Sequence, residues 1–121
     1  MAEPSRPNIF PTLRYKDAST ALEWLKRAFG FEEKAVFRGD DATIHHAELQ
    51  LGSGLIMFGQ HREDGWMEGK APDPLASPQG IYIVISDVDA HHDRAKAAGA
   101  RIVRGPIDED YGSREYSARD L

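Results

Sequence analysis

The stretch LRYKDASTALEWLKRAFGF, residues 13–31, decides the fold because it passes from a strand into a helix. Its first part alternates apolar and polar residues, as half-buried strands do, and Asp17 is of a type that caps helix N-termini. The apolar residues that follow lie on one face of an amphipathic helix: Ala21, Leu22, Leu25, Ala28 and Phe29. Gly30 stands where helices commonly stop. The sequence therefore predicts a strand over residues 8–16 and then a helix.

Residues 32–60, EEKAVFRGDDATIHHAELQLGSGLIMFGQ, extend this unit. Two turn clusters, at residues 39–41 and 52–54, divide them into three runs that suit β-structure. The sequence therefore predicts three consecutive antiparallel strands after the helix.

A second unit follows a long connector over about residues 60–80, which is rich in proline and glycine and has no periodicity. GIYIVISDV, residues 80–88, alternates as a strand does, and DAHHDRAKAAG, residues 89–99, predicts a short helix that stops at Gly99. ARIVRGPI and SREYSARDL, residues 100–107 and 113–121, predict two further strands. The order of elements is that of the first unit.

The two units form an approximate repeat, in which Asp17 corresponds to Asp87 and Gly30 to Gly99, about seventy residues apart. We therefore expect one domain over residues 1–121, with module one at about 8–60, the connector at about 60–80 and module two at about 80–121. The alternative is that two unrelated αβ segments form a ferredoxin-like sandwich.

The composition narrows the classes of partner. The chain has 121 residues, a formal net charge of -5 and no cysteine, so one hydrophobic core suffices and disulfides and thiolate chemistry are excluded. Its basic residues are spread along the chain with acids between them, which argues against nucleic acid and anionic membranes. We expect a cytoplasmic protein whose partner is a small molecule or a second copy of itself.

The order of these segments, together with HHAELQLG at residues 45–52 and YGSREYSARD at 111–120, resembles the vicinal oxygen chelate superfamily of glyoxalases, bleomycin-resistance proteins and extradiol dioxygenases. The resemblance implies an α+β fold of two βαβββ modules. Their curled sheets form a cup, with the helices outside, commonly in homodimers. It also implies one more strand after Leu121, so we expect either a truncated chain or an edge that a partner chain covers.

The resemblance also implies which strand faces line the cup, and alternation along each strand then assigns the side chains. The residues expected to face the cup are Thr12, Arg14, Ile44, His46, Glu48, Gln50, Tyr82, Val84, Ser86, Glu115, Ser117 and Arg119. Leu13, Tyr15, Ile81, Ile83 and Ile85 are expected to pack on the helices instead.

No metal or other cofactor is expected, because the positions that hold metal ligands in the superfamily are occupied here by Phe10 and Gly80. A third ligand would come from the strand beyond Leu121. His45 and His46 are neighbours on a strand and point to opposite faces, so they cannot share one ion. His91 and His92 lie in a predicted helix, where solvated surface positions are expected.

His46 and Glu48 are the candidate catalytic pair, since residues two apart on a strand project side by side and a carboxylate can orient an imidazole as acid or base. The alternative is a polar face in water. Arg14 is a candidate clamp for an anionic ligand, or else forms a salt bridge with Glu48. Tyr82 and Trp66 could stack on a flat ligand.

These residues support a first hypothesis of metal-independent binding of a small molecule in the cup, similar to bleomycin-resistance proteins that sequester their ligand. Thr12, Arg14, His46, Glu48, Tyr82 and Trp66 are the expected ligand-binding residues. One alternative is a metal-dependent glyoxalase-like lyase or ring-cleaving dioxygenase whose metal site has another location. A further alternative is an accessory or regulatory domain without a ligand.

Overall fold

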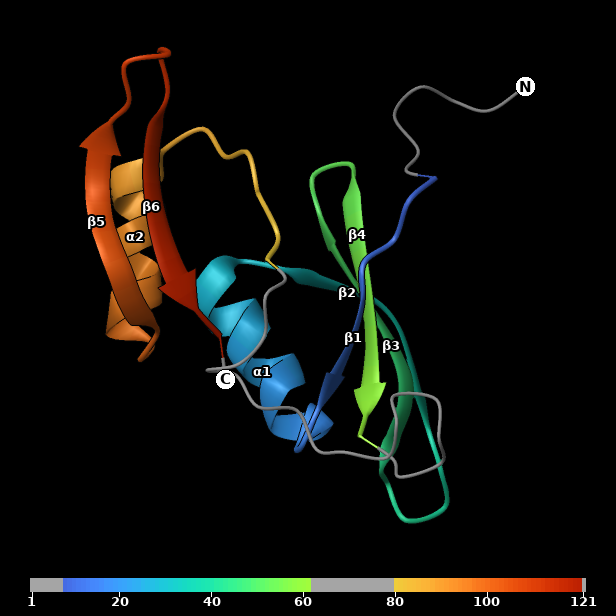
Figure 1. Ribbon diagram of the computed structural model, residues 1–121. Helices are drawn as coiled ribbons and strands as arrows, with labels where there is room; N and C mark the ends of the chain where they lie inside the picture. Colours follow the sequence, from blue (N-terminus) through green and yellow to red (C-terminus); the bar gives the residue numbers. More distant parts are fainter. Residues whose placement is uncertain (1–7, 62–79, 121) are drawn as a thin grey trace.

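The computed structural model describes residues 8–61 and 80–120. Figure 1 shows an α+β protein, as the sequence predicts. In chain order the elements are β1 (Thr12–Tyr15), α1 (Ala18–Phe29), β2 (Glu32–Arg38), β3 (Ile44–Leu51), β4 (Gly54–Gln60), α2 (Val88–Ala97), β5 (Arg101–Asp108) and β6 (Arg114–Arg119). None of the helices in the described ranges is long and apolar enough to cross a membrane.

Helix α1 begins and ends as its sequence predicts. The Asp17 carboxylate accepts a hydrogen bond of 3.1 Å from the backbone N–H of Thr20, which satisfies one of the free donors of the first turn. Gly30 ends the helix in the left-handed conformation, with φ at 83°, that glycine adopts without a steric penalty. Between these two ends the helix presents an apolar face to the first sheet, and Leu22 on that face is 1 % exposed.

The first sheet has the strand order β1-β4-β3-β2. The strands β2, β3 and β4 pair antiparallel in sequence order, which confirms the prediction, and β1 joins the edge of β4 in parallel. Phe58 of β4 is 2 % exposed, and its ring meets the ring of Tyr15 edge-on at 5.3 Å between centroids. The core of the described residues lies between this sheet and α1.

The prediction that Ile44 faces the cup is wrong, because Ile44 is fully buried. The pairing of β2 with β3 slips between Phe37 and Arg38, where Phe37 pairs with His46 but Arg38 pairs with Ile44. A β-bulge of this kind adds one residue to a strand and breaks the alternation of faces. Ile44 therefore lies on the core side with Ala47 and Leu49.

The described residues 80–120, for which we keep the name module two, contain a helix and a two-stranded sheet. The Asp87 carboxylate accepts a hydrogen bond of 3.0 Å from the backbone N–H of Ala90, and Gly99, with φ at 94°, follows the helix. The strands β5 and β6 pair antiparallel, and Ile102, Tyr116 and Ala118 pack toward the core.

The segment of residues 80–86 is not a strand, which corrects the prediction from its alternating sequence. A strand requires a neighbour that supplies its ladder hydrogen bonds, and none of the six strands in the described ranges pairs with it. The side-chain orientations predicted for this segment are confirmed only in part. Ile83 packs against the core, whereas Ile81 is 42 % exposed and Val84 is 86 % exposed.

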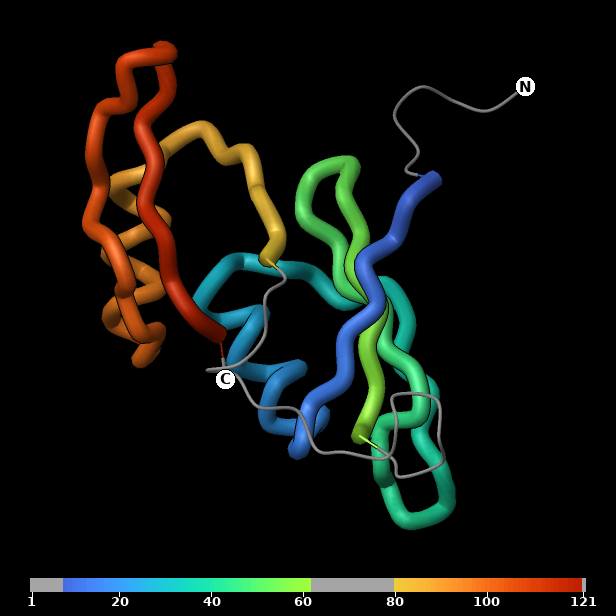
Figure 2. The backbone as a smooth tube through the Cα atoms, in the orientation of Figure 1, coloured from blue at the N-terminus to red at the C-terminus, as the bar shows by residue number. Residues whose placement is uncertain are grey.

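Helix α1 lies between the first sheet and module two (Figure 1). The Trp24 indole N–H donates to the carbonyl of Ala98 at 2.7 Å. In Figure 2 the end of β6 also returns toward the α1 side of the molecule, where Asp120 accepts a hydrogen bond from the Tyr15 hydroxyl. These two contacts join parts of the chain that are far apart in sequence.

His91 is a further link between the modules, not the solvated surface residue that its sequence predicts. Its Nε2 lies 2.9 Å from the carbonyl of Phe29 and must carry the proton, since a carbonyl can only accept. In the neutral ring, its Nδ1 then accepts from the hydroxyl of Tyr116 at 2.6 Å. Neighbouring His92 has a side chain only 15 % exposed.

Candidate functional site

The first sheet has one face packed on α1 and an opposite face with polar side chains, which we call the open face. Pairing across the strands places Glu48 beside Met57 and Met57 beside Thr12. Pairing also places His46 beside Phe37 and Arg14 beside Gly59. The open face is thus formed by Thr12, Arg14, Ala35, Phe37, His46, Glu48, Met57 and Gly59.

His46 and Glu48 form the pair that their spacing predicts. The Nε2 atom of His46 lies 2.9 Å from a carboxylate oxygen of Glu48, with the two side chains 40 % and 27 % exposed. The ring of Phe37, which is 59 % exposed, lies 6.0 Å from the imidazole between centroids. A carboxylate that holds an imidazole fixes its orientation, so His46 can present Nδ1 to a ligand as a donor or an acceptor.

Arg14 lies over Gly59 on the same face. Its Nη1 donates to the carbonyl of Gln60 at 3.2 Å. A Cβ atom at Gly59 would approach this Nη1 to 3.1 Å and the carbonyl oxygen of His45 to 2.6 Å. Only glycine fits there, and its lack of a side chain leaves room for the guanidinium. Thr12, at the start of β1, donates its hydroxyl to the carbonyl of Phe10 at 3.5 Å.

The other predicted ligand-binding residues are not on the open face. Tyr82 belongs to module two, and its hydroxyl donates to Glu115 at 2.5 Å. Trp66 lies outside the described residues. His45 lies against the turn between β2 and β3, where its Nε2 would come within 2.7 Å of a Cβ atom at Gly39. The structure therefore brings four of the predicted residues onto one face, namely Thr12, Arg14, His46 and Glu48.

The donor set does not fit the metal centre that the resemblance implies. Phe10 and Gly80, at the corresponding positions, carry no side-chain donor atom, and divalent metals in proteins normally take at least three such ligands. No group of three histidine, aspartate or glutamate side chains lies together in the part of the chain that the structure describes. Two donors, His46 and Glu48, lie together on the open face and bind one another.

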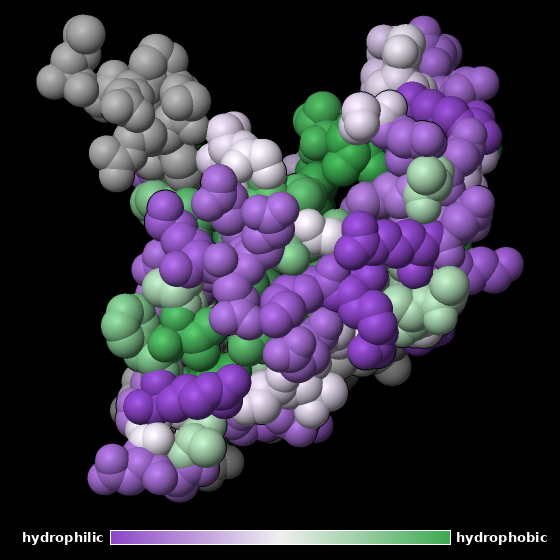
Figure 3. Space-filling view, turned by 180° about the vertical axis from the view of Figure 1, so that it is seen from behind, coloured by the Kyte–Doolittle hydropathy of each residue, from purple (hydrophilic) through white to green (hydrophobic). Residues whose placement is uncertain are grey.

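Two hollows in the described surface lie away from the open face. A cleft of about 420 Å³ separates the turn between β3 and β4 from the start of α2, with Leu51, Val84 and His91 in its walls. From behind it forms a notch between the modules, with hydrophobic surface on its module-two side (Figure 3). Among the described residues, neither hollow is lined by Thr12, Arg14, His46, Glu48 or Tyr82, although Val84 and Ser86, which are expected to face the cup, line the larger one.

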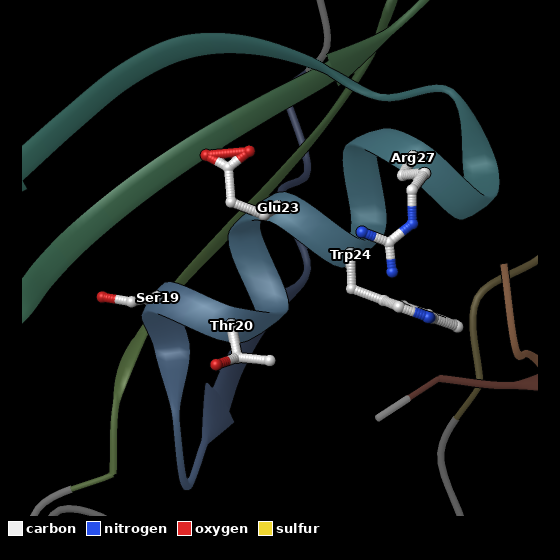
Figure 4. A pocket seen from close by; sticks show the side chains of 5 residues that line it. All are labelled: Ser19, Thr20, Glu23, Trp24 and Arg27. Carbon is white, nitrogen blue, oxygen red and sulfur yellow. The ribbon is translucent and has the colours of Figure 1, made fainter.

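The second hollow, of about 350 Å³, lies along α1. Its lining comes from one helix: Ser19, Thr20, Glu23, Trp24 and Arg27. Figure 4 shows that these side chains diverge from the helix and do not converge on a common point. A ligand would therefore meet few of them at once.

Sequence reasoning missed Phe37, Met57 and Gly59 as members of the open face. Their membership depends on the register of β2 and β4 against β3, which the alternation of single strands does not define. The signal for Gly59 was its place inside a predicted strand, since a glycine there often marks a close approach of backbone or side chain.

Comparisons with known proteins agree with this fold. Residues 9–120 match the family model of the Glyoxalase/Bleomycin resistance protein/Dioxygenase superfamily. An uncharacterised protein of Mycobacterium bovis is 30 % identical over 117 residues, which span 94 % of this chain and 76 % of that protein.

Two solved structures are also similar. TioX from Micromonospora sp. ML1 is 33 % identical with a TM-score of 0.71, over 95 % of this chain and 88 % of TioX. The bleomycin resistance determinant encoded on the transposon Tn5 is 22 % identical with a TM-score of 0.65, over 93 % of this chain and 87 % of that chain. The second likeness is one of fold alone.

Proposed function

This chain belongs to the glyoxalase/bleomycin resistance protein/dioxygenase superfamily, and we propose that it binds a planar or anionic small molecule without a metal ion. The binding surface in this proposal is the open face of the first sheet. The observation that carries the proposal is the oriented His46–Glu48 pair on the same face as Arg14 and the exposed ring of Phe37.

Each of these side chains has a part in such binding. The guanidinium of Arg14 can form paired hydrogen bonds with a carboxylate or phosphate group. His46, with Nε2 held by Glu48, offers one further polar anchor, and Thr12 offers a hydroxyl. The ring of Phe37 supplies an apolar surface for a flat molecule. Tyr82, for which the sequence predicts the same role, lies away from the open face and donates to Glu115 instead, so we assign stacking to Phe37.

The open face needs a cover, because ligand sites in proteins are concave and enclose most of their ligand. We infer that a second copy of the chain supplies it, so that the binding unit is a homodimer in the cytoplasm. The acidic net charge of -5 fits a protein that avoids nucleic acid and anionic membranes.

The experiment that tests the proposal is calorimetric titration of the purified chain with salicylate, a planar aromatic carboxylate, with and without EDTA. Arg14→Gln removes the cation, and Lys96→Gln on the exposed face of α2 is the matched control. We expect EDTA to have no effect, Arg14→Gln to weaken binding by about tenfold or more, and Lys96→Gln to leave it unchanged.

Equal binding by both variants would remove the open face from the proposal. A need for added zinc, nickel, manganese or iron, or turnover of a catechol in their presence, would favour the metal-dependent lyase or dioxygenase instead. Circular dichroism of each variant separates lost binding from lost folding.

A further inference from the structure

Module two holds a carboxylate surrounded by hydroxyl groups from separate parts of the chain. Glu115 of β6 accepts hydrogen bonds from Tyr82 at 2.5 Å, from Ser113 at 2.8 Å and from Tyr111 at 3.0 Å. Tyr82 precedes α2, whereas Ser113 and Tyr111 lie in the turn between β5 and β6. The tertiary fold, not the local sequence, brings Tyr82 to this cluster.

The cluster carries one negative charge at neutral pH. The hydroxyl of Tyr82, followed by that of Ser113, lowers the pKa of Glu115 by stabilising the carboxylate. The hydrogen bond to Glu115 raises the pKa of Tyr82, and desolvation raises the pKa of Tyr111, so both phenols stay neutral. These hydrogen-bond donors are uncharged, which leaves the charge of the carboxylate for a ligand.

The neighbouring charges do not cancel it. Arg104 and Glu109 pair with one another at 2.5 Å, and this pair has no net charge. The negative charge of Glu109 also raises the pKa of Tyr82 and of Tyr111, and the positive charge of Arg104 lowers the pKa of Glu115. The local potential is therefore negative, in keeping with the net charge of the chain.

The two aromatic rings are open to solvent although their hydroxyls are held. Tyr82 is 72 % exposed and Tyr111 is 68 % exposed, and both are tethered to the same carboxylate. Ile107 pairs with Glu115 across the strands and is 44 % exposed. Two exposed aromatic rings and an exposed aliphatic side chain thus lie near one ionised carboxylate.

We propose that Glu115, Tyr82 and Tyr111 form a binding site for an organic ammonium cation. A positive nitrogen is attracted both by the carboxylate and by the negative faces of aromatic rings, and its alkyl groups can contact Ile107. A bare metal ion would require more oxygen ligands than one carboxylate provides. An anion would be repelled.

This site goes beyond the proposed function, since it lies on the other module and selects the opposite charge. It stands whether or not the open face binds salicylate. Tyr82 is not part of the open face, and its role here is to contact a cation through its ring.

The test is a titration followed by NMR, with choline as the probe and 3,3-dimethylbutan-1-ol as its neutral isostere. We expect choline to bind with a dissociation constant on the order of millimolar, to shift the amide signals of Tyr82, Tyr111 and Glu115, and to bind more weakly as salt is added. The neutral isostere should bind at least about tenfold more weakly.

Two variants locate the site. Glu115→Gln keeps the shape of the side chain, removes its charge and should weaken choline binding at least about tenfold. Glu32→Gln, at an exposed position on β2, is the matched control and should have no effect. Tyr111→Ala should weaken binding more than Tyr111→Phe, because only the first removes the ring.

Equal affinity for choline and its isostere, or unchanged binding in folded Glu115→Gln protein, would overturn the proposal. Arg14→Gln should leave choline binding intact. Tighter choline binding by that variant would mean that the cation occupies the open face, where the positive charge of Arg14 opposes it, and this would also overturn the proposal. Failure of the salicylate experiment has no bearing on this result.

Discussion

Both halves of the described chain have a helix followed by antiparallel strands, yet one half, module one, holds nearly all of the core. Each has a helix capped by an aspartate and followed by a glycine with positive φ, Gly30 in one and Gly99 in the other. Among the described residues every buried hydrophobic side chain belongs to module one except two small ones, Ala95 and Ala100. Similar local sequence therefore does not by itself produce a similar amount of burial.

Part of the difference lies in one strand. In module one, β4 lies between β1 and β3 and supplies the buried side chains of Ile56 and Phe58. In the repeat that the sequence predicts, β5 and β6 take the places of β2 and β3, and residues 80–86 take the place of β1, but no described strand takes the place of β4. Without that neighbour, residues 80–86 form no ladder, and Val84 stays exposed.

The largest expected effect in this comparison comes from shortening one side chain in each module. Phe58→Ala should cost about 3–5 kcal/mol of unfolding free energy, since it leaves a cavity beside Tyr15 in the core. Val103→Ala on β5, where the side chain is 58 % exposed, should change the free energy by no more than about 0.5 kcal/mol. Urea denaturation measures both. Similar losses for the two variants would mean that module two contributes a core of its own.

A matched pair of glycines gives the next largest effect. Gly59→Ala places a Cβ atom 2.6 Å from the backbone oxygen of His45, so a strand must shift, at a cost of about 1–3 kcal/mol. Gly105→Ala on β5 meets nothing within 4 Å and should be neutral or slightly stabilising. Thermal unfolding of both variants checks this. A stable Gly59→Ala protein with unchanged salicylate binding would show that Arg14 does not need the room above Gly59.

The fold was predictable where the information is local. Asp17 caps α1, Gly30 ends it, and the turn clusters separate β2, β3 and β4, because capping and turn formation depend on adjacent residues. The prediction of a strand over residues 80–86 was wrong, because a strand depends on a neighbour that its own sequence does not specify. The predicted orientation of Ile44 was wrong for a related reason, since a bulge in β3 is defined only by its pairing with β2.

In the candidate sites, too, the contacts between near neighbours in the sequence were predictable and the others were not. The His46–Glu48 pair follows from their separation by two residues on one strand, and the structure has it at 2.9 Å. The place of Arg14 over Gly59 depends on the register between β1 and β4. The contact of Tyr82 with Glu115 joins residues 33 apart in the sequence, and no local pattern predicts it.

A smaller effect tests the link between the modules. Tyr15→Phe removes the hydrogen bond to Asp120 and should cost about 1 kcal/mol near neutral pH, with the core otherwise intact. Its pH dependence is more specific. Burial, with Asp120 as a further cause, raises the pKa of Tyr15 far above its ordinary value of about 10. The folded state therefore keeps a proton that the unfolded state releases in alkali.

The sign follows from this difference in proton binding. The stability that the Tyr15 phenol contributes is fully present below its unfolded pKa of about 10 and falls as the pH rises above that value. The wild-type protein should lose stability more steeply than Tyr15→Phe between about pH 9 and pH 11. Urea denaturation across this range measures the slopes. Parallel slopes would mean that Tyr15 is accessible to water and that the link to Asp120 does not form.

The smallest expected effect separates the two helix caps, which have nearly the same geometry. The carboxylates of Asp17 and Asp87 each accept a backbone hydrogen bond, at 3.1 Å and 3.0 Å. Asp17→Ala should lower the Tm by a few degrees, because α1 covers the main core. Asp87→Ala should leave the Tm nearly unchanged and should only speed amide exchange in the first turn of α2, since that helix can open without exposing the first sheet.

Acid titration sharpens this last comparison. The hydroxyl and backbone N–H of Thr20 lower the pKa of Asp17, so the cap contributes stability above the unfolded pKa and loses it as the pH falls through the folded pKa. The Tm difference between the wild-type protein and Asp17→Ala should therefore shrink in acid. Equal effects of the two cap variants on the Tm would mean that α1 and α2 unfold as one unit, with the links at Trp24 and His91 strong enough to make the modules a single cooperative body.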